Sequence, residues 1–210
     1  MRTKVFSVLF FLLVFAAASC VAAPGPLTGK IIALDPGHGG HPGAVANGVR
    51  EADVNLAVAL KLRDKLTAMG AAVVMTRTAD QPATGCNSFD DLQFRVALAQ
   101  NTNADVFVSL HSNSYHKAET AGAMTFYQSG RPTDLARAIQ SGLVGEVGVV
   151  DKGVRPANFY VLRNSDIPAA LVEMGFLTNQ AEAARLANDS YQNELAEGVL
   201  KGLLSYFLSR

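Results

Sequence analysis

The sequence predicts a single α/β domain with a mostly parallel, twisted sheet of about six strands, covered by helices on both faces. Apolar runs of strand length alternate with helical patterns along the chain. Several of these runs are apolar throughout, which is typical of strands that are buried on both faces. The length of 210 residues suits one large hydrophobic core, because single cores remain efficient up to roughly 250 residues.

The first half of the folded part predicts a strand, a long helix and a second strand. The run KIIALD at residues 30–35 predicts the first strand, and AAVVMTR at residues 71–77 predicts the second. Between them, residues 51–70 predict an amphipathic helix that ends at a C-cap glycine, Gly70. Its apolar residues recur at every fourth position: Val54, Val58, Leu62 and Leu66.

The second half continues the alternation of strands and helices. Further strands are expected at residues 105–111, 122–129, 159–163 and 168–175. Further helices are expected at residues 90–100, 132–147, 180–188 and 190–210. The strand at 159–163 is predicted from the apolar run FYVLR, and residues 150–158 before it are expected to form a short turn.

Residues 1–23 are predicted to be a secretory signal peptide, followed by one folded domain at residues 28–210. A basic start precedes an apolar core at residues 5–15 that is too short to span a bilayer comfortably, and small residues follow it. An uncleaved anchor helix is the alternative. Pro24 and Pro26 disfavour it because proline breaks a helix. We therefore expect an exported protein with no membrane association beyond this signal.

The charges argue against a nucleic-acid partner. Lysine and arginine total 18, and aspartate and glutamate also total 18, so the chain has no net charge. The sequence contains no block of like charges that would follow a phosphate backbone. No nucleic acid is expected among the partners.

Three ionisable residues stand at the ends of predicted strands. His38 follows the first strand, His111 closes the third, and Glu173 closes the last. Ligands of open α/β sheets bind at the carboxyl ends of parallel strands, so we expect these residues to meet at one edge. Two histidines and a carboxylate are a typical ligand set for catalytic zinc. His41 is an alternative ligand, although an exposed loop position is expected for it.

Glu51 is a candidate for the carboxylate of such a site, and its role is open to two interpretations. This residue lies in the first turn of the long predicted helix, which must pack against the sheet that carries His38. It would be close enough to complete the ligand set. A glutamate at this position also stabilises a helix by complementing its dipole, and the residues alone favour neither role.

Glu173 is also open to two interpretations. It follows the apolar run PAALV, so its carboxylate stands at the edge of a core, where an unpaired charge is costly. It could act as a general base beside a metal-activated water. Alternatively, it could form a structural ion pair with Arg77, Arg95 or Arg163.

Six segments match one enzyme family in order. They are IALDPGHGG, GVREADVNLAVALKLRDKL, VVMTR, RVALAQNTNADVFVSLHSN, GVRPANFYVLRNSDIPAALVEMGFLTN and ELAEGVLKGLLSYF. With these segments the chain closely resembles the zinc-dependent N-acetylmuramoyl-L-alanine amidases, the amidase type 3 family of bacterial cell-wall hydrolases. The resemblance spans about residues 30 to 208. The ordered combination of DPGHGG, SLHSN and VEMGFLTN makes it highly specific.

The resemblance implies a zinc metallo-amidase whose catalytic domain is residues 28–210. It implies that His38, Glu51 and His111 bind Zn²⁺ and that Glu173 is the catalytic residue. The implied reaction is hydrolysis of the amide between N-acetylmuramic acid and the L-alanine of peptidoglycan stem peptides. Two alternatives remain: a zinc peptidase that cuts within the stem peptide, and a non-catalytic cell-wall-binding module. The presence of all four residues disfavours the second.

The resemblance also implies where the protein works and with which partners. Its substrate would be peptidoglycan, in the periplasm or the extracellular cell wall, and we expect a monomer. No wall-binding repeat fits beside the domain, so attachment to the wall would come from the substrate groove or from an envelope partner. Some family members insert a helix that blocks the zinc. Residues 122–159 leave room for one strand, one helix and a turn, so we expect an open site.

Overall fold

A six-stranded sheet forms the centre of the computed structural model, which describes residues 24–41, 43–84 and 88–210. The predicted signal peptide, residues 1–23, lies outside the described residues. The strands of the sheet are β1 (Ile31–Pro36), β4 (Ala72–Met75), β5 (Val106–Asn113), β6 (Ala123–Tyr127), β7 (Asp151–Pro156) and β8 (Ala169–Phe176). They are arranged in the order β4-β1-β5-β8-β6-β7. The first four in that order are parallel, whereas β6 runs antiparallel to β8 and parallel to β7.

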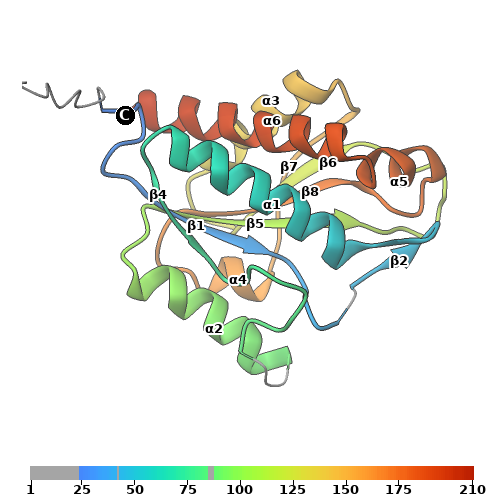
Figure 1. Cartoon of the computed structure of the whole chain (residues 1–210), viewed down its shortest axis with the longest axis horizontal. Coiled ribbons are helices and arrows are strands. Elements are labelled where there is room, and N and C mark those ends of the chain that lie inside the picture. The colour runs from blue at the N-terminus through green and yellow to red at the C-terminus, as the bar shows by residue number, and fades with distance from the viewer. Residues whose placement is uncertain (1–23, 42, 85–87) are drawn as a thin grey trace, which may run out of the picture.

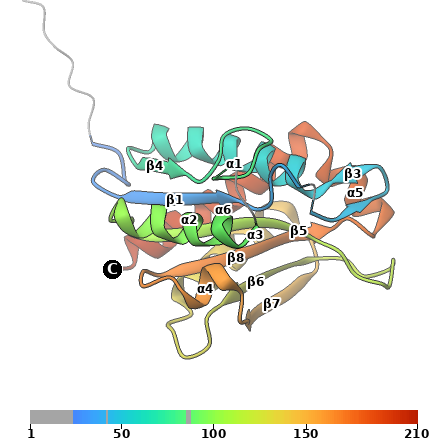
Figure 2. The same cartoon turned by 90° about the horizontal axis from the view of Figure 1, so that it is seen from below.

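Helices cover both faces of this sheet (Figure 1). They are α1 (Glu51–Ala68), α2 (Ser88–Asn101), α3 (Asp134–Val147), α4 (Tyr160–Arg163), α5 (Gln180–Leu186) and α6 (Asp189–Leu208). α1, α3 and α6 lie on one face, and Figure 2 shows α2 and α4 in front of the other. The predicted α/β domain with a mostly parallel sheet is therefore confirmed. No helix within the described residues is long and apolar enough to cross a membrane.

The sandwiched sheet explains why a central strand such as β1 is apolar at successive positions. In β1, Ile32 and Leu34 pack into the larger hydrophobic cluster, whereas Ala33 between them packs into the smaller cluster on the opposite face. Successive side chains of a strand point to opposite faces, so a strand covered on both sides has no solvent-facing position. Val58 and Leu62 of α1 supply the helical side of the larger cluster, as their spacing predicted.

Two errors in the predicted strands cancel in the number of strands, because one predicted strand is a helix and one observed strand was predicted to be a turn. The predicted strand at 159–163 is wrong, because this segment forms the single-turn helix α4, in which the carbonyl of Phe159 accepts the N–H groups of Leu162 and Arg163. Val161 and Leu162 are adjacent and both buried, which a helical turn permits and a strand with one exposed face does not. The turn predicted at 150–158 is also wrong, since it contains β7, the edge strand beside β6.

A short hairpin that the prediction missed leads the chain into α1. Its strands are β2 (Val45–Ala46) and β3 (Val49–Arg50), which pair antiparallel. Asn47 and Gly48 form the turn with φ of 50° and 76°, the positive values that a two-residue hairpin of type I′ requires. The Asn47 side chain donates to the carbonyl of Leu177 at 2.8 Å. The hairpin thus fixes where α1 begins, at Glu51.

Candidate functional site

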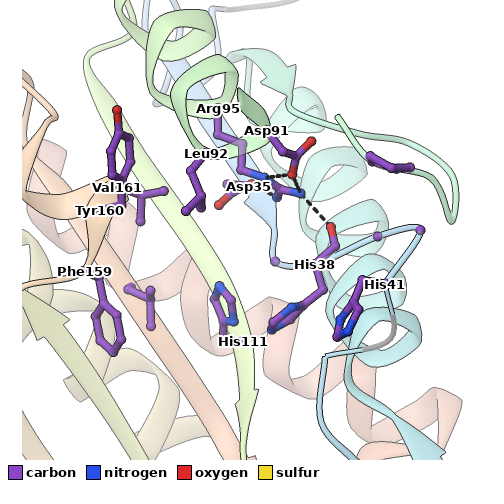
Figure 3. A pocket seen from close by; sticks show the side chains of 15 residues that line it. Asp35, His38, His41, Asp91, Leu92, Arg95, His111, Phe159, Tyr160 and Val161 are labelled. Atoms are coloured by element: carbon purple, nitrogen blue, oxygen red, sulfur yellow. Dashed lines mark hydrogen bonds and ion pairs between the residues drawn. The ribbon is translucent and has the colours of Figure 1, made fainter. Parts of the chain in front are cut away.

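Three predicted residues meet where β1 and β5 end. His38 lies in the loop after β1, His111 lies in β5, and Glu51 is the first residue of α1. Glu51 Oε2 is 3.0 Å from His38 Nε2, and Glu51 Oε1 is 2.9 Å from His111 Nδ1. One ligand atom from each residue lies within 4.8 Å of the others. The rings of His38 and His111 lie side by side in Figure 3, with centroids 5.0 Å apart.

The chemistry of this cluster fits a zinc ion. It offers two imidazole nitrogens and one carboxylate, and zinc binds such ligands at about 2.0–2.2 Å. In a tetrahedral shell, ligand atoms at that distance lie roughly 3.3–3.6 Å from one another. The two observed Glu51–histidine separations, 2.9 and 3.0 Å, are a few tenths of an ångström shorter than this, so these atoms would move apart to admit the ion.

Glu51 is held as a carboxylate by its neighbours. Burial alone would raise the pKa of Glu51, but hydrogen bonds and charge interactions with His111 and His38 outweigh burial and hold this pKa well below its usual range. The N–H groups of Ala44 and Ser112 donate to its two oxygens at 2.9 and 3.3 Å. These backbone donors fix the orientation of the carboxylate, as hydrogen bonds to metal ligands generally do.

Two glycines leave the space that the cluster occupies. A Cβ atom on Gly37 would lie 2.2 Å from the His111 ring. A Cβ atom on Gly43 would lie 2.6 Å from both Glu51 Oε2 and the His38 ring, and Gly43 also has a φ of 68°. A larger residue at either position would therefore displace a side chain of the cluster.

The turn that carries His38 is held by two buried arginines. His38 has a φ of 62°, a left-handed conformation that costs a non-glycine residue roughly 1–3 kcal/mol. Arg95 donates to the carbonyl of His38 at 2.7 Å and to that of Pro36 at 3.1 Å. Arg77 donates to the carbonyls of Pro36 and Gly37 at 2.8 and 2.9 Å. These bonds satisfy the carbonyls of the turn and offset its strain.

Asp35 completes this supporting network, which the sequence prediction missed. It forms a buried ion pair with Arg95 and accepts hydrogen bonds from Thr76 Oγ1 at 2.7 Å and Ser109 Oγ at 2.6 Å. Burial would raise the pKa of Asp35, but Arg95 and the two hydroxyl groups outweigh burial and lower it. The sequence held a signal for this network, because Arg95 shares a face with Leu92 and Ala99 in the predicted helix at residues 90–100, and a charge on an apolar face requires a partner.

Glu173 lies directly opposite His111 in the register of β5 and β8. Its Oε2 atom is buried and has no hydrogen-bond partner among the described residues. Burial raises the pKa of Glu173 to about 7, while the charge of His111 opposes this rise and that of Glu51 adds to it. A carboxyl group whose pKa lies near neutrality is suited to take up and release a proton.

The structural ion pair considered for Glu173 is absent from the described residues. Arg77 and Arg95 are engaged by the His38 turn, and Arg163 donates to the carbonyl of Asn158 at 3.2 Å. None of the ion pairs found in residues 24–41, 43–84 and 88–210 includes Glu173.

The comparisons with known proteins agree with this site. Residues 32–205 match the family described as N-acetylmuramoyl-L-alanine amidase. The chain belongs to this family. It is 40% identical over 200 residues to the uncharacterized protein YqiI of Bacillus subtilis, covering 93% of each chain. It is 37% identical to the germination-specific N-acetylmuramoyl-L-alanine amidase of the same species, covering 88% of this chain and 83% of the relative.

A solved structure extends this agreement to the fold of the amidase domain. The N-acetylmuramoyl-L-alanine amidase from Clostridium difficile 630 superposes with a TM-score of 0.79 at 38% identity, covering 86% of this chain and 98% of that one. The predicted activity, hydrolysis of the N-acetylmuramoyl-L-alanine amide of peptidoglycan, is thus confirmed at the level of the family. Amidases of this family are generally metal-dependent, and the His38–Glu51–His111 cluster could hold the ion.

Two other features of this amidase bear on the site. His41 is exposed, and its ring centroid lies 6.5 Å from that of His38, outside the cluster. Between β6 and α4, α3 is the one helix in the described chain, and it packs against α6 on the far face of the sheet. No helix of this segment therefore covers the cluster.

Proposed function

We propose that this amidase is zinc-dependent, that His38, Glu51 and His111 bind the Zn²⁺, and that Glu173 is the catalytic general base. The observation that carries the proposal is that two glutamates lie at one edge of the sheet in different surroundings. Glu51 is fixed between two histidines, whereas Glu173, across from His111, has a buried oxygen without a hydrogen-bond partner in the described chain. One carboxylate suits a cation, and the other suits proton transfer.

The residues divide the reaction between them. When bound, zinc would polarise the scissile carbonyl and lower the pKa of water. Glu173 takes the proton of the attacking water and delivers it to the leaving amine of L-alanine, and such general acid–base catalysis contributes about 10²–10⁴-fold to the rate. Arg77 and Arg95 hold the turn from which His38 reaches the site. The route requires no covalent intermediate.

The proposal includes the setting in which the enzyme acts. Residues 1–23 serve as a signal peptide that exports the domain at residues 28–210 to the periplasm or the extracellular cell wall. There a monomer meets peptidoglycan, its substrate. Attachment to the wall comes from the substrate groove or from an envelope partner.

Digestion of purified peptidoglycan tests the reaction and its metal. We expect the protein to release intact stem peptides that begin with L-alanine, and a chelator to stop this release until zinc is restored. Fragments cut within the stem peptide would identify the zinc peptidase instead. Binding to the wall without any released product would identify the wall-binding module.

A substitution at Glu173 tests the assignment of the base. Glu173→Ala should retain zinc, measured by elemental analysis of the dialysed protein, and lose peptide release. Glu194→Ala is the matched control, because Glu194 is an exposed glutamate of α6. Full activity of Glu173→Ala would overturn the assignment.

A further inference from the structure

A pocket of about 480 Å³ opens beside the metal cluster, on the face of the sheet that α2 and α4 cover (Figure 3). His38 and His111 form one side of it, and the other side is apolar. The apolar side consists of Leu92, Phe159, Tyr160, Val161 and Leu171. Pockets of this size hold small organic ligands, so this one can take a single sugar-sized group of the substrate next to the scissile bond.

The charges of the pocket do not suit an acidic ligand. Among its lining residues the one arginine or lysine is Arg95. Its guanidinium is fully engaged, because it donates to Asp35, to Asp91 and to the carbonyls of Pro36 and His38. The stem peptide carries free carboxyl groups beyond L-alanine, and a carboxylate placed against the apolar side, away from the metal cluster, would have no free arginine or lysine of the pocket to pair with.

Phe159 gives the pocket a fixed aromatic surface. Its side chain is 41% exposed, and its ring is braced edge-on by Phe126 at a centroid distance of 5.3 Å. The backbone at Phe159 is held by the first turn of α4. An exposed aromatic ring that is already immobilised binds a ligand with little loss of conformational entropy. The C–H face of a pyranose ring suits such a surface, as does the methyl group of an N-acetyl substituent.

The position of Glu173 indicates how the two sides of the scissile bond are oriented relative to the pocket. Glu173 follows Leu171 by two residues in β8, so both side chains point to the same face, with Glu173 nearer the carboxyl end. Leu171 lines the pocket and Glu173 does not. The proton acceptor must lie beside the leaving amine to which it returns the proton. The amine side of the scissile bond therefore lies toward Glu173, and the acyl side lies toward the pocket.

From these observations we infer that the pocket binds the muramyl sugar, with Phe159 as its stacking surface, while the stem peptide extends past Glu173. The inference rests on the proposed function, because it assigns the two halves of that substrate. It names Phe159 as a residue that determines specificity for the glycan side of the bond.

Two substrates with the same scissile amide test this inference. One is N-acetylmuramoyl-L-alanyl-D-isoglutamine, and the other is D-lactoyl-L-alanyl-D-isoglutamine, which lacks the sugar. We expect the wild-type protein to have the higher kcat/KM for the muramyl substrate. Phe159→Ala should reduce the ratio of the two kcat/KM values about tenfold, and Phe159→Tyr should preserve it.

Phe94→Ala is the matched control, since Phe94 of α2 is 37% exposed and does not line the pocket. It should leave the ratio at the wild-type value. An equal loss on both substrates in Phe159→Ala would overturn the inference. So would a Phe159→Ala loss that disappears on N-acetylmuramoyl-L-alanine, which keeps the sugar and lacks D-isoglutamine, because the pocket would then hold the peptide.

A binding measurement separates this inference from the proposed function. The probe is the peptide-free disaccharide of N-acetylglucosamine and N-acetylmuramic acid, with its affinity measured by calorimetry. If the wild-type protein cleaves neither substrate, the proposed function fails, yet binding of the disaccharide that weakens about tenfold in Phe159→Ala supports the sugar pocket. Absence of binding to the wild-type protein, or equal binding to both proteins, overturns it.

Discussion

Glu51 and Glu173 lie at the same edge of one sheet in opposite electrostatic surroundings. Glu51 is enclosed by two histidines and two backbone donors, and its pKa is held well below the usual range. Glu173 has a buried oxygen without a hydrogen-bond partner among the described residues, and burial raises its pKa to about 7. Burial acts in the same direction on both groups, so their hydrogen-bond partners decide the difference. That difference suits Glu51 to bind a cation and Glu173 to accept a proton.

The largest expected effect comes from removing the charge of each glutamate in turn. Glu173→Gln should lower kcat about 10²–10⁴-fold while the protein keeps its zinc, because only proton transfer is lost. Glu51→Gln should instead lose zinc on dialysis, since the amide is a poor ligand. Metal content and kcat of both variants check this contrast. Equal zinc loss in the two variants would contradict the division of roles.

A third carboxylate, Asp35, sharpens the comparison because it is buried but paired. Asp35→Asn removes one of the two carboxylates that pair with Arg95, while Asp91 remains, and should lower the free energy of unfolding by about 2 kcal/mol at neutral pH. The pKa of Asp35 is lowered in the folded protein, so its stabilising effect is present above its ordinary pKa of 3.8 and is lost as the pH falls through the folded-state value. Denaturant unfolding of both proteins from pH 7 to pH 3 measures this.

The gap between wild type and Asp35→Asn should remain constant above about pH 5 and narrow below 3.8. A gap that widened on acidification would mean that Asp35 is not stabilised as a carboxylate in the folded protein.

A smaller effect is expected from a residue that contacts Glu51 but is not one of the three proposed metal ligands. Asn55 of α1 donates to Glu51 Oε1 at 3.4 Å and to the carbonyl of Gly37 at 3.3 Å. Asn55→Ala should weaken zinc binding about tenfold, as is typical when a hydrogen bond to a metal ligand is removed. Competition with a chromophoric chelator gives the affinity. Asn193→Ala, at an exposed position of α6, is the control and should bind zinc like the wild type.

The smallest expected effect concerns an ion pair at the surface. Lys61 Nζ lies 2.6 Å from Asp189 Oδ1, but the Asp189 side chain is 88% exposed. Lys61→Gln should change the free energy of unfolding by less than about 1 kcal/mol, because solvent screens such pairs. Thermal and denaturant unfolding of Lys61→Gln and Asp35→Asn, measured side by side, would compare the two losses in the free energy of unfolding. A loss as large as that of Asp35→Asn would contradict the view that burial with a partner sets the effect.

The strand ends of the site could be predicted because they depend on local pattern. Apolar runs located β1, β5 and β8, and the rule that parallel strands share a carboxyl edge brought His38, His111 and Glu173 together. The run at 159–163 was misassigned because a five-residue segment with four apolar residues is compatible with a strand or with a helical turn. That segment carries Phe159, so the error fell on the wall of the pocket. The hairpin before α1 was missed although its Asn-Gly turn is a strong local signal.

By itself, the sequence determined the fold class, the family and the residue types of the site, because periodicity and motif order are properties of the chain. Only the tertiary structure decided which charges are paired. Arg77 and Arg95 could have met Glu173, but packing directs both to the His38 turn and leaves Glu173 without an ion-pair partner in the described chain. The pKa of a carboxylate depends on its burial and its partners, and these come from elements far apart in the sequence.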